Sequence, residues 1–146
     1  MIILDHREIE ALIPHSGSMC LLDAVLAWDA ASLRCVSRCH LLPGNPMRRV
    51  DGTLGAACGI ELAAQAMAIH GRLVSGNSGP PARGALASVR DVHLRTATLD
   101  DIEGDLTIDA QRLMGDGQGA SYRFVITGDG AEVLSGRATV LLGIGP

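Results

Sequence analysis

The chain has 146 residues, 47% of them hydrophobic, and carries a formal charge of −4. This length allows one domain with its own hydrophobic core, and we expect residues 1–146 to form it. The acidic balance argues against nucleic acid as a partner. No apolar run reaches the roughly 20 residues that cross a bilayer, and the charged N-terminus does not fit a secretory signal. We therefore expect a cytoplasmic protein with no membrane partner.

The first third of the chain predicts a short helix, two strands and a loop. Apolar residues among charges favour a helix over 5–13, ended by a proline. An apolar run over 20–28 and an alternating stretch over 33–40 are typical of strands. Proline and glycine over 41–52 indicate a loop, and Thr53 is a suitable N-cap for a helix that follows.

Residues 55–71 predict the central element of the fold. The stretch consists of good helix formers without proline, and it is apolar or small on almost every side. That pattern indicates a helix covered by the rest of the protein. Glu61 is its only acidic residue, and Gln65 lies one turn later on the same face. Because a buried carboxylate is costly unless it is paired or used, Glu61 is the first candidate for a functional residue.

After a flexible connection over 75–81, the chain predicts four strands, over 84–94, 104–114, 120–127 and 132–142. A Gly-Asp-Gly sequence between the last two is typical of a hairpin turn. The whole order favours an α+β fold in which an antiparallel sheet is wrapped around a long central helix. The open edges of such a sheet favour pairing with a second copy, so we expect a homodimer or a larger oligomer.

Two motifs resemble a known family. The first is Leu-Ile-Pro-His at 12–15 with the apolar stretch that follows it to Val25, and the second is Gly-Ile-Glu-Leu-Ala-Ala-Gln-Ala at 59–66. In this order they resemble the hot-dog-fold 3-hydroxyacyl-acyl carrier protein dehydratases, and more closely a divergent branch from bacterial aryl-polyene-type gene clusters. The resemblance implies a single hot-dog fold without a cofactor.

The same resemblance implies a reaction and its partners. A 3-hydroxyacyl thioester on the phosphopantetheine of an acyl carrier protein would lose water to give a trans-2-enoyl thioester, in fatty-acid or polyene-type biosynthesis. A hot-dog partner subunit would be an alternative to the homodimer. The reaction needs a base, an acid and donors to an enolate oxygen. Glu61, with its pKa raised by burial, is expected to be the acid or to hold water, with Gln65 beside it. Backbone N–H groups near Gly55 and Gly59 are the expected donors.

Two histidines are candidates for the base. His40 belongs to the sequence Cys-His-Leu-Leu-Pro-Gly-Asn-Pro, which is similar to the histidine loop of the family. It stands 21 residues before Glu61, whereas the family spacing is about fourteen. The spacing leaves open whether His40 still reaches the site. His15, in the proline-histidine turn, is the other candidate, and the resemblance to the divergent branch, which keeps this histidine but not the one in the loop, favours His15.

Arg48 and Arg49 precede the central helix and are candidates for binding an acidic carrier protein and the phosphate of its substrate. Ordinary surface charge is the alternative. Cys35, Cys39 and His40 have poor spacing for zinc, so we expect no metal site and buried, reduced thiols.

Two further functions remain open from the sequence. A hot-dog acyl-thioesterase would use Glu61 to activate water against the same thioester. A catalytically degenerate subunit would hold acyl chains beside an active partner. The unusual position of His40 keeps this last alternative open.

Overall fold

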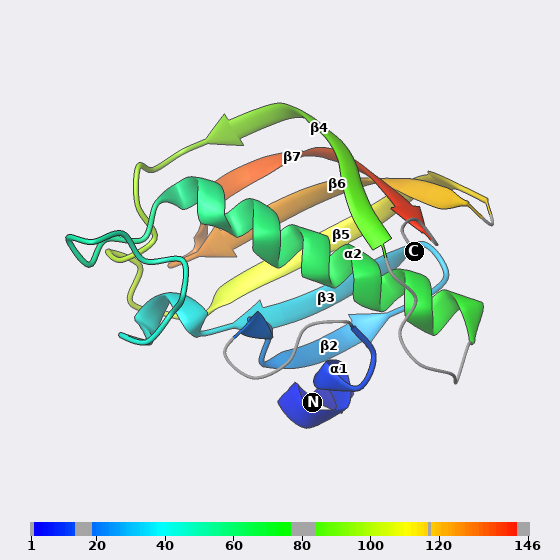
Figure 1. Ribbon diagram of the computed structural model, residues 1–146, viewed down its shortest axis with the longest axis horizontal. Coiled ribbons are helices and arrows are strands. Elements are labelled where there is room, and N and C mark those ends of the chain that lie inside the picture. The colour runs from blue at the N-terminus through cyan, green and yellow to red at the C-terminus, as the bar shows by residue number, and fades with distance from the viewer. Residues whose placement is uncertain (1, 14–18, 77–83, 117, 143–146) are drawn as a thin grey trace.

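In the part of the chain that the structure describes, seven antiparallel strands form one sheet, and a long helix lies along one face of it (Figure 1). The computed structural model describes residues 2–13, 19–76, 84–116 and 118–142. The strand order is β1-β2-β3-β5-β6-β7-β4, so the strand that follows the long helix pairs at the far edge. The elements in chain order are β1 (Leu4–Asp5), α1 (His6–Glu10), β2 (Ala24–Trp28), β3 (Ser32–Ser37), η2 (Cys39–Leu41), η3 (Ala56–Cys58), α2 (Gly59–Ser75), β4 (Gly84–Leu94), β5 (Leu106–Gly115), β6 (Gly119–Gly128) and β7 (Ala131–Leu142).

The predicted second half is confirmed almost residue by residue. β4 has the expected bounds, and β5, β6 and β7 differ from the expected strands by at most two residues at either end. The hairpin between β6 and β7 turns through Asp129 at φ 50° and Gly130 at φ 80°. Two successive left-handed residues match the right-handed twist of the strands, which is why Asp-Gly is favoured there.

Three predictions for the first half were wrong in their bounds. The strand expected over 20–28 begins only at Ala24. The first helix is only His6–Glu10. It begins with a capping box in which Asp5 and Glu8 each accept the other's backbone N–H. The strand expected over 33–40 ends at Ser37, whose hydroxyl donates to the carbonyl oxygen of Leu21 and accepts the N–H of Cys39. This contact turns the chain into the 3₁₀ turn η2 and takes it away from the sheet.

Thr53 is not the cap of the long helix. Its N–H and its hydroxyl both donate to Oδ1 of Asp51, at 3.0 and 2.7 Å, which closes a local turn. A 3₁₀ turn, η3, then precedes α2, which begins at Gly59 without a side-chain cap and extends to Ser75. The predicted helix over 55–71 therefore begins later and ends later than expected.

The close approach of α2 to the sheet depends on Gly59. A Cβ at this position would lie 2.5 Å from Leu134 Cδ2 and 3.2 Å from Ile126 Cδ1. The helix buries Leu62 and Ile69 completely, and it contacts β3, β5, β6 and β7. A larger residue at Gly59 would hold the first turn off the sheet.

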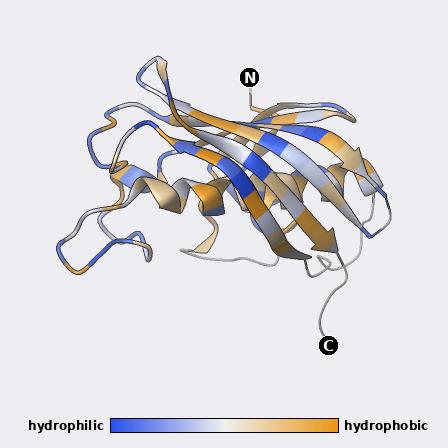
Figure 2. Ribbon diagram, turned by 90° about the horizontal axis from the view of Figure 1, so that it is seen from above, coloured by the Kyte–Doolittle hydropathy of each residue, from blue (hydrophilic) through white to orange (hydrophobic). Residues whose placement is uncertain are grey.

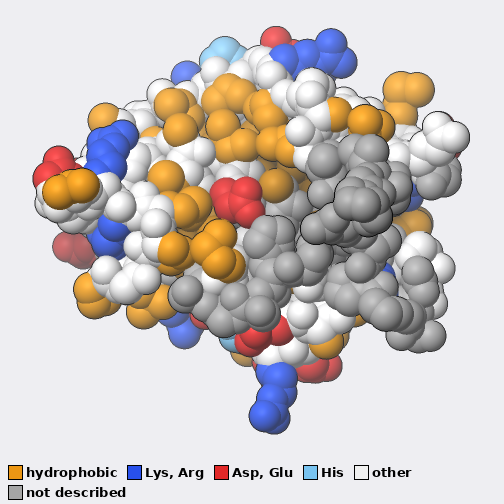
Figure 3. Space-filling model, viewed as in Figure 1, with side chains coloured by type: hydrophobic (Ala, Val, Ile, Leu, Met, Phe, Trp, Pro, Cys, Tyr) orange, Lys and Arg blue, Asp and Glu red, His pale blue; other side chains and the backbone are white. Residues whose placement is uncertain are grey.

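Contrary to the expectation from its composition, α2 is not covered on every side. The residues of one stripe are only half-buried, and they are Ile60, Glu61, Ala64, Ala68 and Gly71. They recur at the helical spacing of three and four residues, so they form one face. Figure 3, viewed from the helix side, shows hydrophobic side chains gathered on the surface with an acidic group among them.

The second half of α2 is held by a buried neutral pair. His70 Nε2 lies 2.8 Å from the carbonyl oxygen of Asp29, so Nε2 donates and Nδ1 accepts the Tyr122 hydroxyl at 2.7 Å. Burial lowers the pKa of His70 and raises the pKa of Tyr122 to about 12. Both groups stay neutral near pH 7, which makes them a link between α2, β6 and the β2–β3 turn.

We expect Gly59→Ala to lower the free energy of unfolding by about 1–3 kcal/mol, because the added methyl group overpacks the contact with Leu134. Gly71→Ala is the matched control on the same helix. A Cβ there meets nothing within 4 Å, so this change is expected to raise stability by about 0.5–1 kcal/mol. Urea unfolding of both variants measures the difference, and equal stabilities would contradict this account of the packing.

Candidate active site

The start of α2 is pinned to the segment between β4 and β5. Ala56 N–H donates to Ala97 O at 3.0 Å, and Leu99 N–H donates to Leu54 O at 2.8 Å. Leu54 and Leu99 are buried, so these bonds lie in a dry environment. The position of the first helical turn is therefore set by a segment more than 40 residues away in sequence.

Gln65 ties the first turns of α2 to the chain that precedes β2. Its Oε1 accepts the N–H of Leu21 at 2.9 Å, and its Nε2 donates to Met19 O at 2.8 Å and to Glu61 Oε1 at 3.3 Å. Gln65 is buried, whereas Glu61 is half-buried in the first turn. The amide thus orients the carboxylate and fixes the neighbouring segment at the same time. Glu61 is less deeply buried than its sequence context indicated.

His15, the favoured base, lies outside the described residues. The described chain resumes at Met19, four residues after His15. Gln65 Nε2 donates to the carbonyl oxygen of Met19.

His40 is buried and has a partner on one side of its ring. Its Nε2 lies 3.0 Å from the carbonyl oxygens of both Ile102 and Gly104, so this nitrogen donates. Its Nδ1 is buried and has no hydrogen-bond partner in the described structure. The ring therefore connects η2 to the turn before β5.

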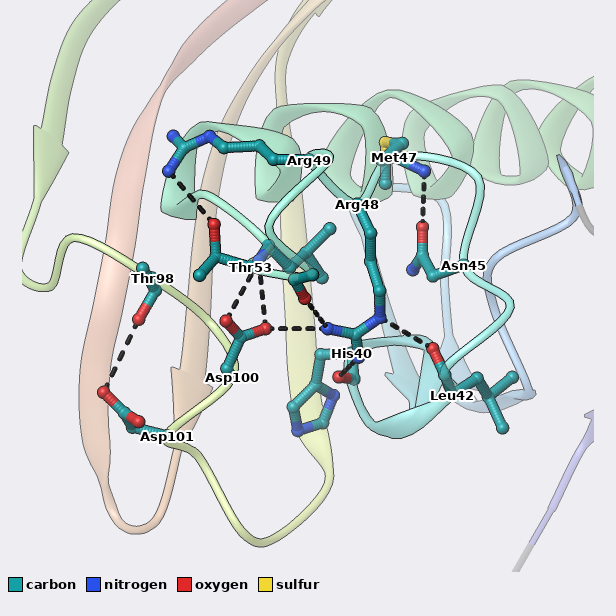
Figure 4. A network of polar contacts seen from close by, with 12 residues as sticks. His40, Leu42, Asn45, Met47, Arg48, Arg49, Thr53, Thr98, Asp100 and Asp101 are labelled. Atoms are coloured by element: carbon teal, nitrogen blue, oxygen red, sulfur yellow. Dashed lines mark hydrogen bonds and ion pairs between the residues drawn. The ribbon is translucent and has the colours of Figure 1, made fainter.

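Arg48 organises the loop before α2 (Figure 4). Its Nε donates to Leu42 O at 2.9 Å, its Nη2 to His40 O at 2.6 Å and its Nη1 to Gly52 O at 2.8 Å. Nη1 also pairs with Oδ1 of Asp100 at 3.0 Å. Because three carbonyl oxygens and a carboxylate occupy one guanidinium, Arg48 serves the structure of the loop.

Arg49 is more available than Arg48. Its Nη2 would lie 2.5 Å from a Cβ on Gly55, so the guanidinium rests against the backbone of Gly55. Among the described residues, its side chain donates one hydrogen bond, to Thr53 Oγ1 at 3.5 Å, and forms no ion pair. This arrangement places a positive charge beside the 3₁₀ turn.

The N–H groups near the start of α2 are mostly used. Ala56 donates to Ala97 O, Cys58 to Gly55 O, and Gly59 to carbonyl oxygens of η3. Within the described structure, the N–H groups of Gly55 and the exposed Ala57 have no acceptor. Gly59 faces the sheet, so its lack of a side chain serves helix packing.

A groove of about 490 Å³ opens beside the segment that Gln65 holds. It lies between α1 and the loop after η2, and its lining is His6, Cys20, Leu21, Asp23, Cys39, Leu42, Pro43, Gly44 and Asn45. Burial raises the pKa of Cys20 to about 11, so this thiol stays protonated near pH 7. All four cysteines are free.

Two features of the site had little or no sequence signal. Asp100 holds Arg48 and also accepts the N–H of Leu54 at 3.0 Å, yet it is 46 and more residues away from both. The unused N–H of Ala57 follows from the 3₁₀ turn, which composition did not predict. No three or more His, Cys, Asp or Glu side chains in the described ranges are arranged to hold a metal ion. None of the described helices is long and apolar enough to span a membrane.

One long helix on an antiparallel sheet with this strand order is a hot-dog fold. Solved structures of the same architecture support this. The model of the ApeP-like family, described as ApeP dehydratase, matches residues 7–143. The chain belongs to this family of dehydratases.

Among solved structures, the chain is similar to the dehydratase heterocomplex ApeI:P from Xenorhabdus doucetiae. The TM-score is 0.81 at 21% identity, over 92% of this chain and 90% of that chain. An HP0420 homologue from Helicobacter felis has a TM-score of 0.65 at 12% identity, over 97% and 90%. The thioesterase HI1161 from Haemophilus influenzae has a TM-score of 0.63 at 11% identity, over 95% and 90%. These identities establish the fold alone. No curated protein matches the chain.

We expect Gln65→Met to lower the free energy of unfolding by about 2–4 kcal/mol, because Leu21 N–H and Met19 O both lose a buried partner. Gln111→Met is the matched control, since Gln111 is exposed on β5 and should change stability by less than about 0.5 kcal/mol. Chemical denaturation measures both. A Gln65 variant as stable as the control would show that the amide does not hold this segment.

Proposed function

We propose that this dehydratase acts on 3-hydroxyacyl thioesters carried by an acyl carrier protein and forms trans-2-enoyl thioesters. The observation that carries the proposal is the half-buried Glu61, held by Gln65 in the first turn of α2 beside unused backbone N–H groups. An orienting amide, a carboxylate and backbone donors within one helix start are suited to proton transfer next to a polarised carbonyl.

The reaction divides between three groups. The N–H groups of Gly55 and Ala57 would donate to the thioester oxygen as negative charge develops on it. His15 would remove the proton from the carbon next to the carbonyl, since an imidazole is matched to that task near neutral pH. Glu61 would protonate the departing hydroxyl, which leaves as water as its C–O bond breaks. The histidine then releases its proton to solvent, and Glu61 takes one up before the next turnover.

His15 is preferred to His40 on physical grounds. The Nε2 of His40 already donates to two carbonyl oxygens, and its ring is buried between two turns. The nitrogen left to act as a base, Nδ1, is buried, so a substrate could reach it only if the surrounding turns moved apart. His40 therefore has a structural role in this proposal.

The carrier protein would approach at the loop before α2. Arg49 lies against Gly55 and has no ion pair among the described residues, so it is suited to the phosphate of the phosphopantetheine arm. Arg48 would support this loop from within. The groove beside Leu21 also has the apolar side chains of Leu42 and Pro43 in its lining, and it would accept part of the acyl arm.

The chain would work with a second hot-dog subunit, either another copy or a different chain. The half-exposed stripe on α2 and the long edge strand β4 are two surfaces that a partner could cover. The ApeI:P dehydratase of Xenorhabdus doucetiae is a heterocomplex. A second candidate function follows from this: an acyl-binding subunit beside an active partner, favoured by the engaged ring of His40.

We expect Glu61→Gln to reduce enoyl-thioester formation from carrier-bound 3-hydroxyacyl substrate by about 100-fold or more, because the amide cannot donate the acidic proton. Glu103→Gln, at an exposed turn, is the control and should keep full activity. The assay follows enoyl product and free thiol together. Full activity of the Glu61 variant would refute the proposed role, thiol release would indicate a thioesterase, and no product with wild-type protein would favour the acyl-binding subunit.

We expect Arg49→Ala to raise KM for carrier-bound substrate about tenfold and to leave kcat within about twofold, because it removes a phosphate contact and no reacting group. Arg7→Ala, an exposed arginine on α1, is the matched control. Steady-state kinetics of both variants decide the point. If KM for the Arg49 variant equals that of the control, the carrier does not dock at this loop.

A further inference from the structure

Three arginines stand side by side on the outer face of the sheet. Arg123 on β6 is directly opposite Arg137 on β7, and Arg137 is directly opposite Arg90 on β4. Residues that pair across antiparallel strands share a face. All three are exposed, whereas Phe124, next to Arg123, is buried on the helix side. In Figure 2, where the strands lie in front of α2, hydrophilic positions stand next to each other on neighbouring strands.

The charge of this arginine row is hardly balanced within the chain. The side chains of Arg123 and Arg90 form no ion pair or hydrogen bond among the described residues. Arg137 has only Asp91, at 3.9 Å, and both of these side chains are largely exposed. Like charges directly opposite one another destabilise a sheet, so the row works against the fold.

Other sheet-side arginines show that the fold can pair such groups. Arg34 contacts Asp109 at 2.7 Å, Arg38 contacts Asp105 at 2.8 Å, and Arg95 contacts Glu132 at 3.0 Å. The arginine row therefore differs from these paired arginines, although the net charge of the chain is −4.

Hydroxyl groups extend the row on one side. Ser121, Thr139 and Ser88 pair with one another across the same three strands, each two residues from an arginine and so on the same face. Their side chains have no hydrogen-bond partner among the described residues. Guanidinium groups with hydroxyl donors beside them are suited to carboxylates.

The distances between the three arginines determine whether a helix or an extended strand of a partner can contact all of them. Neighbouring strands lie about 4.8 Å apart, so the outer two arginines are separated by roughly 10 Å at the backbone. A helix rises about 1.5 Å per residue, so positions i and i+7 are about 10.5 Å apart, with i+3 or i+4 between them. Alternate residues of an extended strand are about 6.6 Å apart and would miss the middle arginine. A helix with three acids on one face matches all three.

We propose that the outer face of β4, β6 and β7 docks an α-helix of a partner protein that carries acidic side chains at positions i, i+4 and i+7. The helix would cross the strands, with one carboxylate on each of Arg123, Arg137 and Arg90. The net negative charge of the chain disfavours a nucleic acid, whose long-range repulsion is much larger than that of a short acidic helix. This contact is separate from the dehydration site, and its test does not depend on activity.

The test uses an alanine-rich helical peptide with glutamates at i, i+4 and i+7, and an isomer of equal composition whose glutamates are spread around the helix. Binding is measured by fluorescence anisotropy with the full chain, at about 50 and 200 mM salt. Arg123→Gln with Arg137→Gln should weaken binding of the patterned peptide at least tenfold at low salt. Arg7→Gln with Arg38→Gln changes the net charge equally and should stay within about twofold. Wild-type protein should prefer the patterned peptide and lose affinity as salt rises.

A thermal melt separates docking from a structural role. Because the row is self-repelling, the Arg123 and Arg137 double variant should have a Tm no lower than wild type. Equal affinity of the double variant and wild type would overturn the proposal, as would equal affinity for the two peptides. A lower Tm of the double variant would also overturn it, because the row would then stabilise the fold. Equally tight binding of a DNA duplex would overturn it as well. So would a changed sedimentation coefficient of the free double variant, because that would indicate that the row is a contact between copies of this chain.

Discussion

The contact between Gly59 and the sheet is the constraint on which the rest of the structure depends. It lets the first turn of α2 lie against Leu134 and Ile126, and together with the hydrogen bonds to Ala97 and Leu99 it positions the candidate functional groups of that turn. Gln65, one and a half turns later, then reaches the backbone of Met19 and Leu21. The carboxylate of Glu61 contacts the Gln65 amide, so the helix start that packs on the sheet also carries the candidate acid.

The loop that resembles the histidine loop of the family is held in place by contacts within the fold. In the stretch from His40 to Pro46, the histidine ring binds two carbonyl oxygens of the turn before β5, and its own carbonyl oxygen accepts from Arg48. Asp100 completes the arrangement by pairing with Arg48 and accepting Leu54 N–H. Both ends of the loop are thereby fixed to the segment between β4 and β5. The cost is a buried Nδ1 of His40 that has no partner in the described structure.

The two faces of the fold present different chemistry. On the helix side, a half-exposed stripe of small and apolar residues surrounds Glu61, which suits a close-packed partner and an acyl group. On the opposite side of the sheet, the arginine row leaves positive charge with little internal compensation. An apolar face and a charged face allow one subunit to serve two kinds of contact, one tight and one sensitive to salt.

The sequence by itself determined the architecture. Alternation and turn residues defined the strands, since side chains alternate across a strand and Asp-Gly tolerates a left-handed turn. The apolar run with Glu61 and Gln65 defined the helix and the candidate acid, because helical spacing puts these two on one face. Only the tertiary structure decided that Arg48 is internal, that Thr53 caps nothing, that Gly59 serves packing, and that three arginines meet in one row. Those outcomes depend on Asp100, Asp51, Leu134 and the strand register, which are contacts or pairings that local pattern does not encode.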